Sequence, residues 1–323
     1  MVDVRTAPRS PGVELALSMA RNAAVRLFQV AILLWVISTA LFFLLRMSGD
    51  PAHTMAGENA SPEMIEQIRV QYGLNGTFIE QYQAFIGQML VLDFGASLST
   101  GRDAMELVLE QLPPTLFLAV AAIAINIVVA LPLGGWLGTR PETGAKRFTG
   151  VLVAIVQGVP GYVIGLVLIQ IFAVSLGVLP SVTGGGAGSV LLPALTLASF
   201  QVPKLVRVVA SSVAESMEQD YVRTALANGG TPSEVLFRHA MPNALLATTA
   251  LIGAQFAFLL SGSLITEYLF NWPGLGLLLV NSVTRLDFPV VQAAVFVIAL
   301  LVFVVNTVMD LLFQVADPRL RRR

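Results

Sequence analysis

The side chains that most often do chemistry are scarce in this chain of 323 residues. It contains no cysteine, two histidines (His53 and His239) and two lysines (Lys146 and Lys204). Disulfides, thiolate zinc sites and cysteine nucleophiles are therefore excluded. No His-Glu-x-x-His spacing offers a metal site, and no Gly-x-Ser-x-Gly turn presents an activated serine. The sequence predicts no catalytic residue and no metal site.

Nucleotide binding through a P-loop is excluded as well, because that loop needs the sequence Gly-Lys-Ser/Thr to hold phosphates. Lys146 lies in "GAKRF" and Lys204 lies in "VPKLV", so neither fits. The net charge of −1 provides no basic field for nucleic acid. His53 is interpreted as a loop residue, and His239 as a contact or packing residue. We expect the chain to bind no cofactor and not to be an enzyme.

Amide side chains inside long apolar runs are the remaining candidates for a functional path. Each could line a wet cavity or hydrogen-bond to a neighbouring helix, and the sequence leaves both possibilities open. These amides are Asn126, Gln157, Gln170, Gln201, Gln255 and Asn306.

Two further stretches could form gates. In "QGVPGYVIG" (157–165), Pro160 and Gly161 can kink a helix, and Gln157 and Tyr162 flank the kink. The spacing Gly161-x-x-x-Gly165 allows close helix approach, which also suits a static bundle. In "ITEYLFNWPGLG" (265–276), Glu267 precedes a helix-breaking segment. We interpret that segment as re-entrant or surface-lying near an outer gate, with anchoring by its aromatic residues as the alternative.

The elements that must position these residues are membrane-spanning helices. Hydrophobic residues make up 55% of the chain and charged residues only 12%. Because about 20 apolar residues cross a bilayer, the long charge-free runs predict an all-α, polytopic membrane protein with six spans. Lys204 and Arg207 in the fourth span must lie at its interfacial end or face a wet interior. The first run is too long for a signal peptide and lacks a cleavage site. The spans are expected near residues 27–46, 112–138, 149–176, 190–212, 243–266 and 289–312.

Basic residues predict the orientation. Six spans place both termini on one side, and of the 19 Lys and Arg residues only Arg46, Arg69, Arg102 and Arg285 fall on the other. The positive-inside rule therefore makes both termini cytoplasmic.

The chain divides accordingly into a cytoplasmic segment (1–26), a transmembrane permease domain (27–313) and a basic cytoplasmic tail (314–323). A loop over about 47–111 is external, with short helices expected after the cap Ser61 and over Phe78–Leu90. These helices either cover the outer mouth of the bundle or form a lid without ligand contacts.

The polar stretch "QDYVRTALANGGTPSEVLFRHAMPNAL" (219–245) lies in a second, cytoplasmic loop over about 213–242. Tyr221, Ala225 and Leu226 repeat at helical spacing, and Gly229 with Gly230 provides a left-handed stop. Thr231 then caps a second helix, with Glu234 at the capping-box position. From residue types alone, this helix pair is either a solvated connector or a knob that docks into a groove of another protein.

The same stretch resembles the cytoplasmic loop signature of ABC-transporter permeases. Other segments, in order along the chain, are similar to the B-type subunit of dipeptide and oligopeptide importers in the peptide/nickel branch. Leu226, Asn228 and Gly230 depart from the family pattern, which affects individual docking contacts. The similar segments are "GDPAHTMAGENASPE", "YGLN", "DFGASLSTG", "LPPTL", "LPALTLA", "WPGLG" and "ADPRLR".

The resemblance implies one half of a heterodimeric importer for short peptides in a bacterial inner membrane. Its implied partners are a C-type permease, two ATPase subunits that hold ATP and magnesium, and an extracytoplasmic binding protein. Nickel chelates, glutathione or opine-like solutes are alternative cargoes. The loop would dock on an ATPase through Asp220, Tyr221, Arg223, Ala225, Leu226, Asn228, Gly229, Glu234, His239 and Asn243.

Two other classes of protein are alternatives: a secondary transporter and an intramembrane enzyme. A secondary transporter would need an ion-coupling carboxylate within a span, whereas Glu267 and Asp310 lie at span ends. An intramembrane enzyme would need a catalytic histidine or acid at membrane depth, and the predicted spans contain no histidine.

Overall fold

The computed structural model describes residues 11–48, 51–56, 60–71, 75–139, 142–182 and 187–316. In these residues the regular structure is helical, and the only bridge is an isolated one between Ala96 and Asp103. An all-α, polytopic membrane protein is therefore confirmed. Most of the basic tail, residues 317–323, lies outside the described residues.

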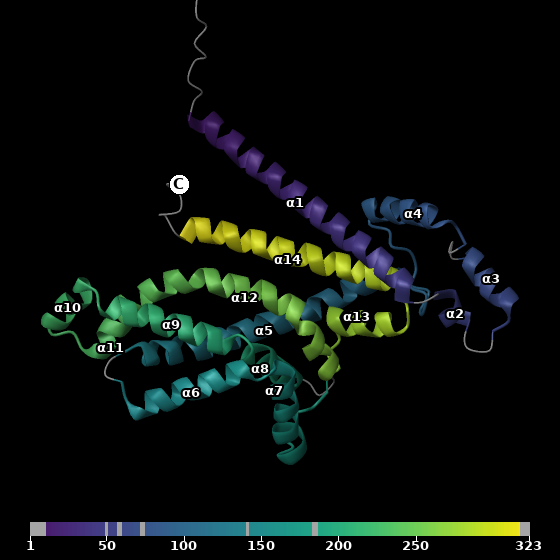
Figure 1. Ribbon diagram of the computed structural model, residues 1–323. Coiled ribbons are helices and arrows are strands. Elements are labelled where there is room, and N and C mark those ends of the chain that lie inside the picture. Colours follow the sequence, from purple (N-terminus) through teal and green to yellow (C-terminus); the bar gives the residue numbers. More distant parts are fainter. Residues whose placement is uncertain are drawn as a thin grey trace, which may run out of the picture. The chain divides into compact units, whose positions relative to one another are not determined.

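Long apolar helices account for the predicted spans (Figure 1). Three helices are long enough to cross a membrane singly, within α1 (Pro11–Ser48), α5 (Ala104–Gly138) and α14 (Phe288–Ala316). Bent helix pairs bring the number to as many as six if each pair is one span. The bends are 105° between Gly144–Gly158 and Gly161–Ser175, 55° between Gly188–Ser199 and Val202–Met217, and 50° within α12 (Met241–Leu269).

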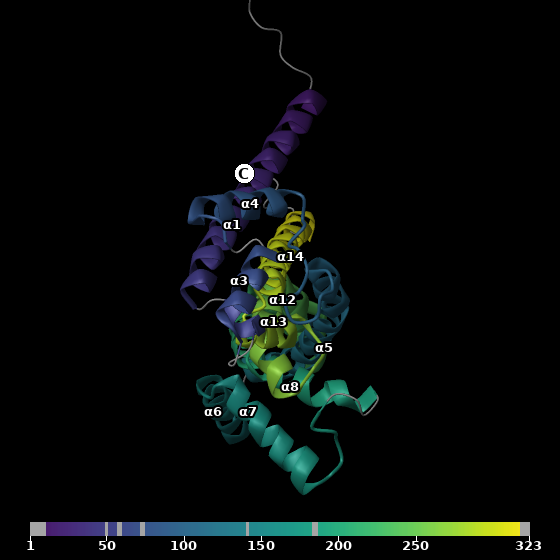
Figure 2. The ribbon, with the colours of Figure 1, turned by 90° about the vertical axis from the view of Figure 1, so that its right-hand side faces the viewer.

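The chain separates into two compact units, Met1–Gly49 and Asp50–Arg323. The first unit contains α1. In the second, α5, α12 and α14 pack on one another and on the short helix α13 (Leu275–Thr284), as the view along the bundle shows (Figure 2). The remaining elements of this unit are α6 (Gly144–Gly158), α7 (Gly161–Leu168), the π-helix η1 (Ile169–Ser175), the 3-10 helix η2 (Ala187–Val190), α8 (Leu191–Ser199) and α9 (Val202–Met217).

Two glycines of α5 let α9 pack closely against it. Gly134 and Gly138 lie one turn apart on α5, and a Cβ at Gly134 would come within 2.7 Å of the Val206 carbonyl oxygen. A Cβ at Gly138 would lie 2.8 Å from the Val213 Cβ. These two glycines therefore form a notch that receives α9, as small residues do between membrane helices. The notch fixes which face of α9 is buried, namely Leu205, Val206, Val209 and Val213.

Short helices occupy the predicted external loop: α2 (Pro51–Ala56), α3 (Pro62–Gln71) and α4 (Phe78–Leu90). Ser61 caps α3 by accepting a hydrogen bond from the Met64 N–H (3.3 Å), as the sequence predicts. The bounds of α4 match the predicted helix, and Thr77 and Glu80 form a reciprocal capping box before it.

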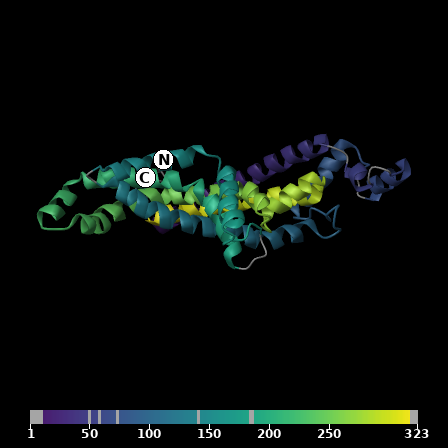
Figure 3. The ribbon, with the colours of Figure 1, turned by 90° about the horizontal axis from the view of Figure 1, so that it is seen from below.

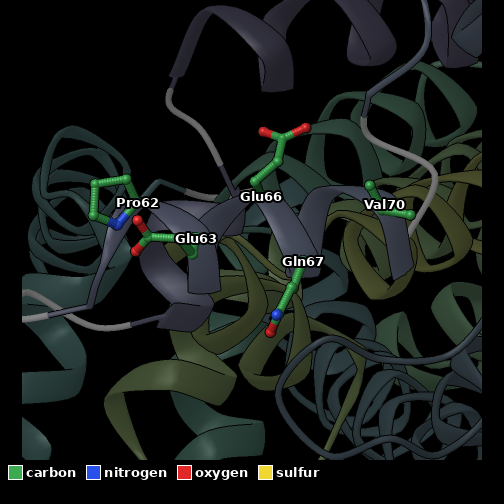
Figure 4. Close-up of a pocket in the computed structure, with 5 residues that line it drawn as sticks. All are labelled: Pro62, Glu63, Glu66, Gln67 and Val70. Atoms are coloured by element: carbon green, nitrogen blue, oxygen red, sulfur yellow. The ribbon is translucent and has the colours of Figure 1, made fainter.

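One exposed face of α3 contains a shallow depression lined by Pro62, Glu63, Glu66, Gln67 and Val70 (Figure 4). The carboxylate of Glu66 and the amide of Gln67 point in opposite directions, and Glu66 forms an exposed ion pair with Arg69 (3.3 Å). The described residues that line the depression therefore present no convergent polar groups, and we assign no ligand to it.

Candidate functional site: the elbow and the helix breaks

A helical elbow connects α9 to α12. It consists of α10 (Asp220–Ala227), α11 (Pro232–Val235) and a π-helix, η3 (Leu236–Ala240), which continues into α12. The elbow projects from one end of the bundle (Figure 3). Val222 and Val235 are buried and anchor it, whereas Tyr221 and Leu226 remain exposed. The predicted pair of helices around a glycine turn is confirmed.

The turn of the elbow depends on two glycines for different reasons. Gly229 has a φ of 88°, a left-handed conformation that side chains disfavour. Gly230 donates its N–H to the Ala225 carbonyl oxygen (3.1 Å), which closes the end of α10. A Cβ at Gly230 would lie 2.9 Å from that oxygen and 3.2 Å from Val235 Cγ2. The second glycine, unusual for the family pattern, thus lets α11 fold closely against α10.

The N-terminus of α11 is capped by Thr231, whose hydroxyl accepts from the Glu234 N–H (3.2 Å). Only this half of the expected capping box is seen, because the Glu234 carboxylate accepts from Arg238 instead (3.3 Å). A carboxylate in the first turn of a helix is nevertheless favourable with respect to the helix dipole.

A depression of about 450 Å³ lies between α10 and α11. Six of the ten predicted docking residues line it, while Asp220, Arg223 and Leu226 lie on the exposed surface beside it. Asn243, at the start of α12, is hydrogen-bonded to Tyr221 on α10. The structure therefore brings the predicted residues together on one projection. The six lining residues are Tyr221, Ala225, Asn228, Gly229, Glu234 and His239.

The candidate gate residues separate into three places. Gln157, Pro160, Gly161 and Tyr162 lie at the 105° bend between α6 and α7. The expected kink at Pro160 is confirmed. A Cβ at Gly161 would collide with the ring of Phe200, so the close approach predicted for this glycine is confirmed too. The α6–α7 break thus rests against the break between α8 and α9.

Gln255 belongs to a different, buried group. Its side-chain oxygen accepts from Asn126 Nδ2 (2.8 Å), and its Nε2 donates to the Gln201 carbonyl oxygen (3.2 Å). Gln255, Asn126 and Gln201 are all buried. Of the two possibilities left open by the sequence, the amides of Asn126 and Gln255 follow the interhelical one, whereas Gln201 takes part through its backbone carbonyl. Gln157, Gln170 and Asn306 are exposed on their helices.

Glu267 is fully buried near the end of α12. One carboxylate oxygen accepts from the Gly276 N–H (2.6 Å), and Gly274 packs against the same side chain. Trp272 is also buried and donates its indole N–H to the Pro114 carbonyl oxygen (3.1 Å). The "WPGLG" segment therefore folds over Glu267 and leads into the short apolar helix α13, and Trp272 contacts protein rather than serving as an exposed anchor.

Sequence reasoning missed a second buried carboxylate, Asp287. It accepts hydrogen bonds from the hydroxyls of Ser97 (2.6 Å) and Ser99 (2.8 Å) and from the N–H groups of Leu98 (3.0 Å) and Ser99 (3.2 Å). Asp287 thereby fastens the "DFGASLSTG" loop to the start of α14. Ser97 and Ser99, inside the segment "DFGASLSTG", were the available signal, but nothing in the sequence pairs them with an acid some 190 positions away.

Comparison with known proteins decides the family. Residues 130–322 match the family described as "Binding-protein-dependent transport system inner membrane component". Residues 19–119 match the corresponding N-terminal family. The chain belongs to this family of membrane permeases. It is an ABC-transporter permease of the peptide/nickel family and a subunit of an importer, and such permeases are not themselves enzymes.

Relatives cover nearly the whole chain. The glutathione transport system permease protein GsiC of Escherichia coli strain K12 is 32% identical over 289 residues, which is 89% of this chain and 94% of that protein. GsiC of Shigella dysenteriae matches equally well. The fold resembles a chain of the inward-facing MetNI methionine ABC transporter, with a TM-score of 0.55, 18% identity and coverage of 66% of this chain and 97% of that one. A chain of an amino acid ABC transporter gives a TM-score of 0.52 at 16% identity, covering 65% and 94% of the two chains.

No group of three or more His, Asp or Glu residues that could hold a metal is found in the described part of the chain.

Proposed function

We propose that this permease is the B-type subunit of an importer for short peptides, with both termini in the cytoplasm. It would pair with a C-type permease, two ATPase subunits that bind ATP and magnesium, and an extracytoplasmic binding protein. The observation that carries the proposal is the elbow, which collects the predicted docking residues on one projecting surface.

Several contacts favour force transmission through this elbow. Val222 and Val235 are buried, and α10 contacts α9 while α11 contacts η3, so the elbow is packed on the elements that it joins. The elbow joins α9 directly to α12, and both helices pack on α5. A rigid-body displacement of the elbow would therefore be transmitted to three helices at once, as a coupling element requires.

The exposed surface of the elbow is suited to a groove on an ATPase. Leu226 and Tyr221 are 41% and 42% exposed and supply an apolar contact, while Asp220, Arg223 and Arg238 supply charge around it. An apolar centre with a polar rim is the usual anatomy of a protein interface.

The relatives named for glutathione transport favour a short-peptide cargo, since glutathione is itself a tripeptide. Nickel chelates and opine-like solutes are the alternatives. In this class of importer much of the choice of cargo belongs to the binding protein, so this chain constrains the cargo weakly.

The test is co-purification of the chain with the products of neighbouring genes, followed by mass analysis of the solute held by the binding protein. We expect two ATPase subunits, a second permease and a bound short peptide. Solute movement by the isolated chain without ATPases would overturn the proposal and favour a secondary transporter.

A further inference from the structure

Two basic side chains lie at a helix break within a long stretch of mostly apolar sequence. Between Arg147 and Glu215 the only charged residues are Lys204 and Arg207. Both lie in the first two turns of α9, directly after the 55° break that separates it from α8. A charged side chain within a span faces a wet cavity or a partner rather than lipid, because exposure to hydrocarbon costs several kcal/mol.

The packing of α9 determines where these cations point. Because Val206, Val209 and Val213 fill the notch at Gly134 and Gly138, the opposite face of α9 is turned away from α5. That exposed face consists of Lys204, Arg207, Ser211 and Glu215, which recur at helical spacing.

Lys204 and Arg207 lie at the end of this face that is farther from the elbow. Met217 ends α9 at the elbow, and Lys204 precedes it by 13 residues (217 − 204), or about 20 Å along the helix axis. A lipid whose head group lies beside the elbow end of α9 would have to move that head group by about the same distance to reach Lys204.

Neither cation is neutralised by an acidic residue in the part of the chain that the structure describes. The single hydrogen bond of Arg207 joins its Nη1 to the Gln157 side-chain oxygen (2.9 Å). A guanidinium has five N–H donors, so most of its donors stay available. Gln157 belongs to α6, one residue before that helix ends at the α6–α7 break. The cations therefore lie where the two helix breaks meet, beside the contact of Phe200 with Gly161.

We propose that Lys204 and Arg207 form a binding site for a carboxylate group of the cargo as it passes the paired helix breaks. The assignment rests on the importer function proposed above and adds to it a chemical class of cargo. Arginine presents a planar fork that matches a carboxylate, and Lys204 adds a second positive charge one turn away. Every unmodified short peptide carries a C-terminal carboxylate.

The test uses the complete transporter in phosphatidylcholine vesicles, with a tripeptide as the free acid and as the C-terminal amide. Uptake is normalised to the occupancy of the binding protein, which removes that protein's own preference. Since a charged hydrogen-bonded contact is typically worth a factor of ten or more, Arg207→Gln should lower uptake of the acid about tenfold and leave that of the amide unchanged. Arg207→Lys keeps the positive charge and should retain part of the uptake that Arg207→Gln loses. The double variant, Lys204→Gln with Arg207→Gln, should lose more uptake of the acid than either single variant.

Two controls separate the site from other roles. Arg147→Gln removes an exposed cation of α6 from a different position, and both cargoes should keep their uptake. Gln157→Ala removes the partner of Arg207 but keeps the charge, so it should affect acid and amide alike.

Three results would overturn the assignment. Equal losses of acid and amide in Arg207→Gln would make Arg207 a structural residue. If the variant lost uptake only in vesicles that contain phosphatidylglycerol, Lys204 and Arg207 would be a lipid site. If less of the second permease co-purified with the variant, they would belong to the interface between the two permeases. Failure of the proposed function is recognised separately, because the wild-type complex would then show no ATP-dependent uptake of either peptide.

Discussion

Asn243 at the start of α12 donates a hydrogen bond from its Nδ2 to the Tyr221 hydroxyl on α10 (2.9 Å), and the same Nδ2 donates to the His239 carbonyl oxygen (3.0 Å). One side chain thus joins the first helix of the elbow to the helix that leaves it. We call this pair of hydrogen bonds the brace. It helps to fix the angle between α10 and α12, and its bonds can be removed one at a time by substitution.

Removing the brace should weaken coupling without preventing membrane insertion. Asn243→Ala removes both hydrogen bonds and Tyr221→Phe removes one, and each bond is worth about 0.5–1.5 kcal/mol. We expect ATP-driven uptake to fall by roughly two- to tenfold in Asn243→Ala and less in Tyr221→Phe. Uptake in vesicles and the amount of inserted protein are the two measurements. Equal uptake by all three proteins would show that the brace has no role in coupling.

A bulky residue at Gly229 should separate ATP hydrolysis from uptake. Its φ of 88° costs a β-branched residue about 1–2 kcal/mol, so Gly229→Val should distort the turn. We expect hydrolysis by the assembled complex to continue while uptake is lost. Gly87→Ala is a suitable control, since a Cβ there meets nothing within 4 Å and the residue lies inside α4. Unchanged uptake in Gly229→Val would mean that the elbow is not the docking element.

The sequence was sufficient for features that depend on local patterns. Charge-free runs located the spans, and Pro160 located the bend because proline lacks the N–H that would continue the helix and is followed by Gly161. The glycine turn of the elbow followed from the same kind of rule. Contacts between distant segments were not predictable. Asn126 and Gln255 are 129 positions apart, and residue types alone left open whether each faced water or another helix. Their pairing depends on helix rotation, which is set by packing such as that at Gly134 and Gly138.

Asp287 should hold the loop at residues 97–99 in place. Asp287→Ala leaves four donors of Ser97, Leu98 and Ser99 without their acceptor, and a hydrogen bond to a charged group is worth about 1.5–3 kcal/mol. We expect proteases to cut this loop faster in the variant, while the spans stay intact. Asp93→Ala is the matched control, because Asp93 bonds only locally, to the Gly95 N–H. Similar cleavage of Asp287→Ala and the wild type would refute the fastening role.

Glu267 should stabilise the fold of the "WPGLG" segment. Glu267→Ala leaves the buried Gly276 N–H unpaired and opens a cavity beside Gly274, with a cost of about 1–3 kcal/mol for the lost acceptor alone. Glu267→Gln keeps an acceptor at nearly the same position and should recover most of the stability. The thermal midpoint of the detergent-solubilised protein measures the difference. If Glu267→Gln lowered the thermal midpoint as much as Glu267→Ala, the negative charge of Glu267 rather than its hydrogen bond would be the stabilising feature.

Acidification should loosen the N-terminus of α4. Hydrogen bonds from the Thr77 N–H (2.8 Å), and from the Thr77 side chain, lower the pKa of Glu80 below its ordinary value. Because the folded-state pKa is the lower one, the capping contribution is complete above the unfolded-state pKa and is lost as the pH falls through the folded-state pKa. Hydrogen exchange at the first turn of α4 should therefore show more opening at low pH, after correction for the intrinsic exchange rate. Glu80→Gln, which does not titrate, should lose this pH dependence; if the opening of α4 still followed pH in that variant, another group would control it.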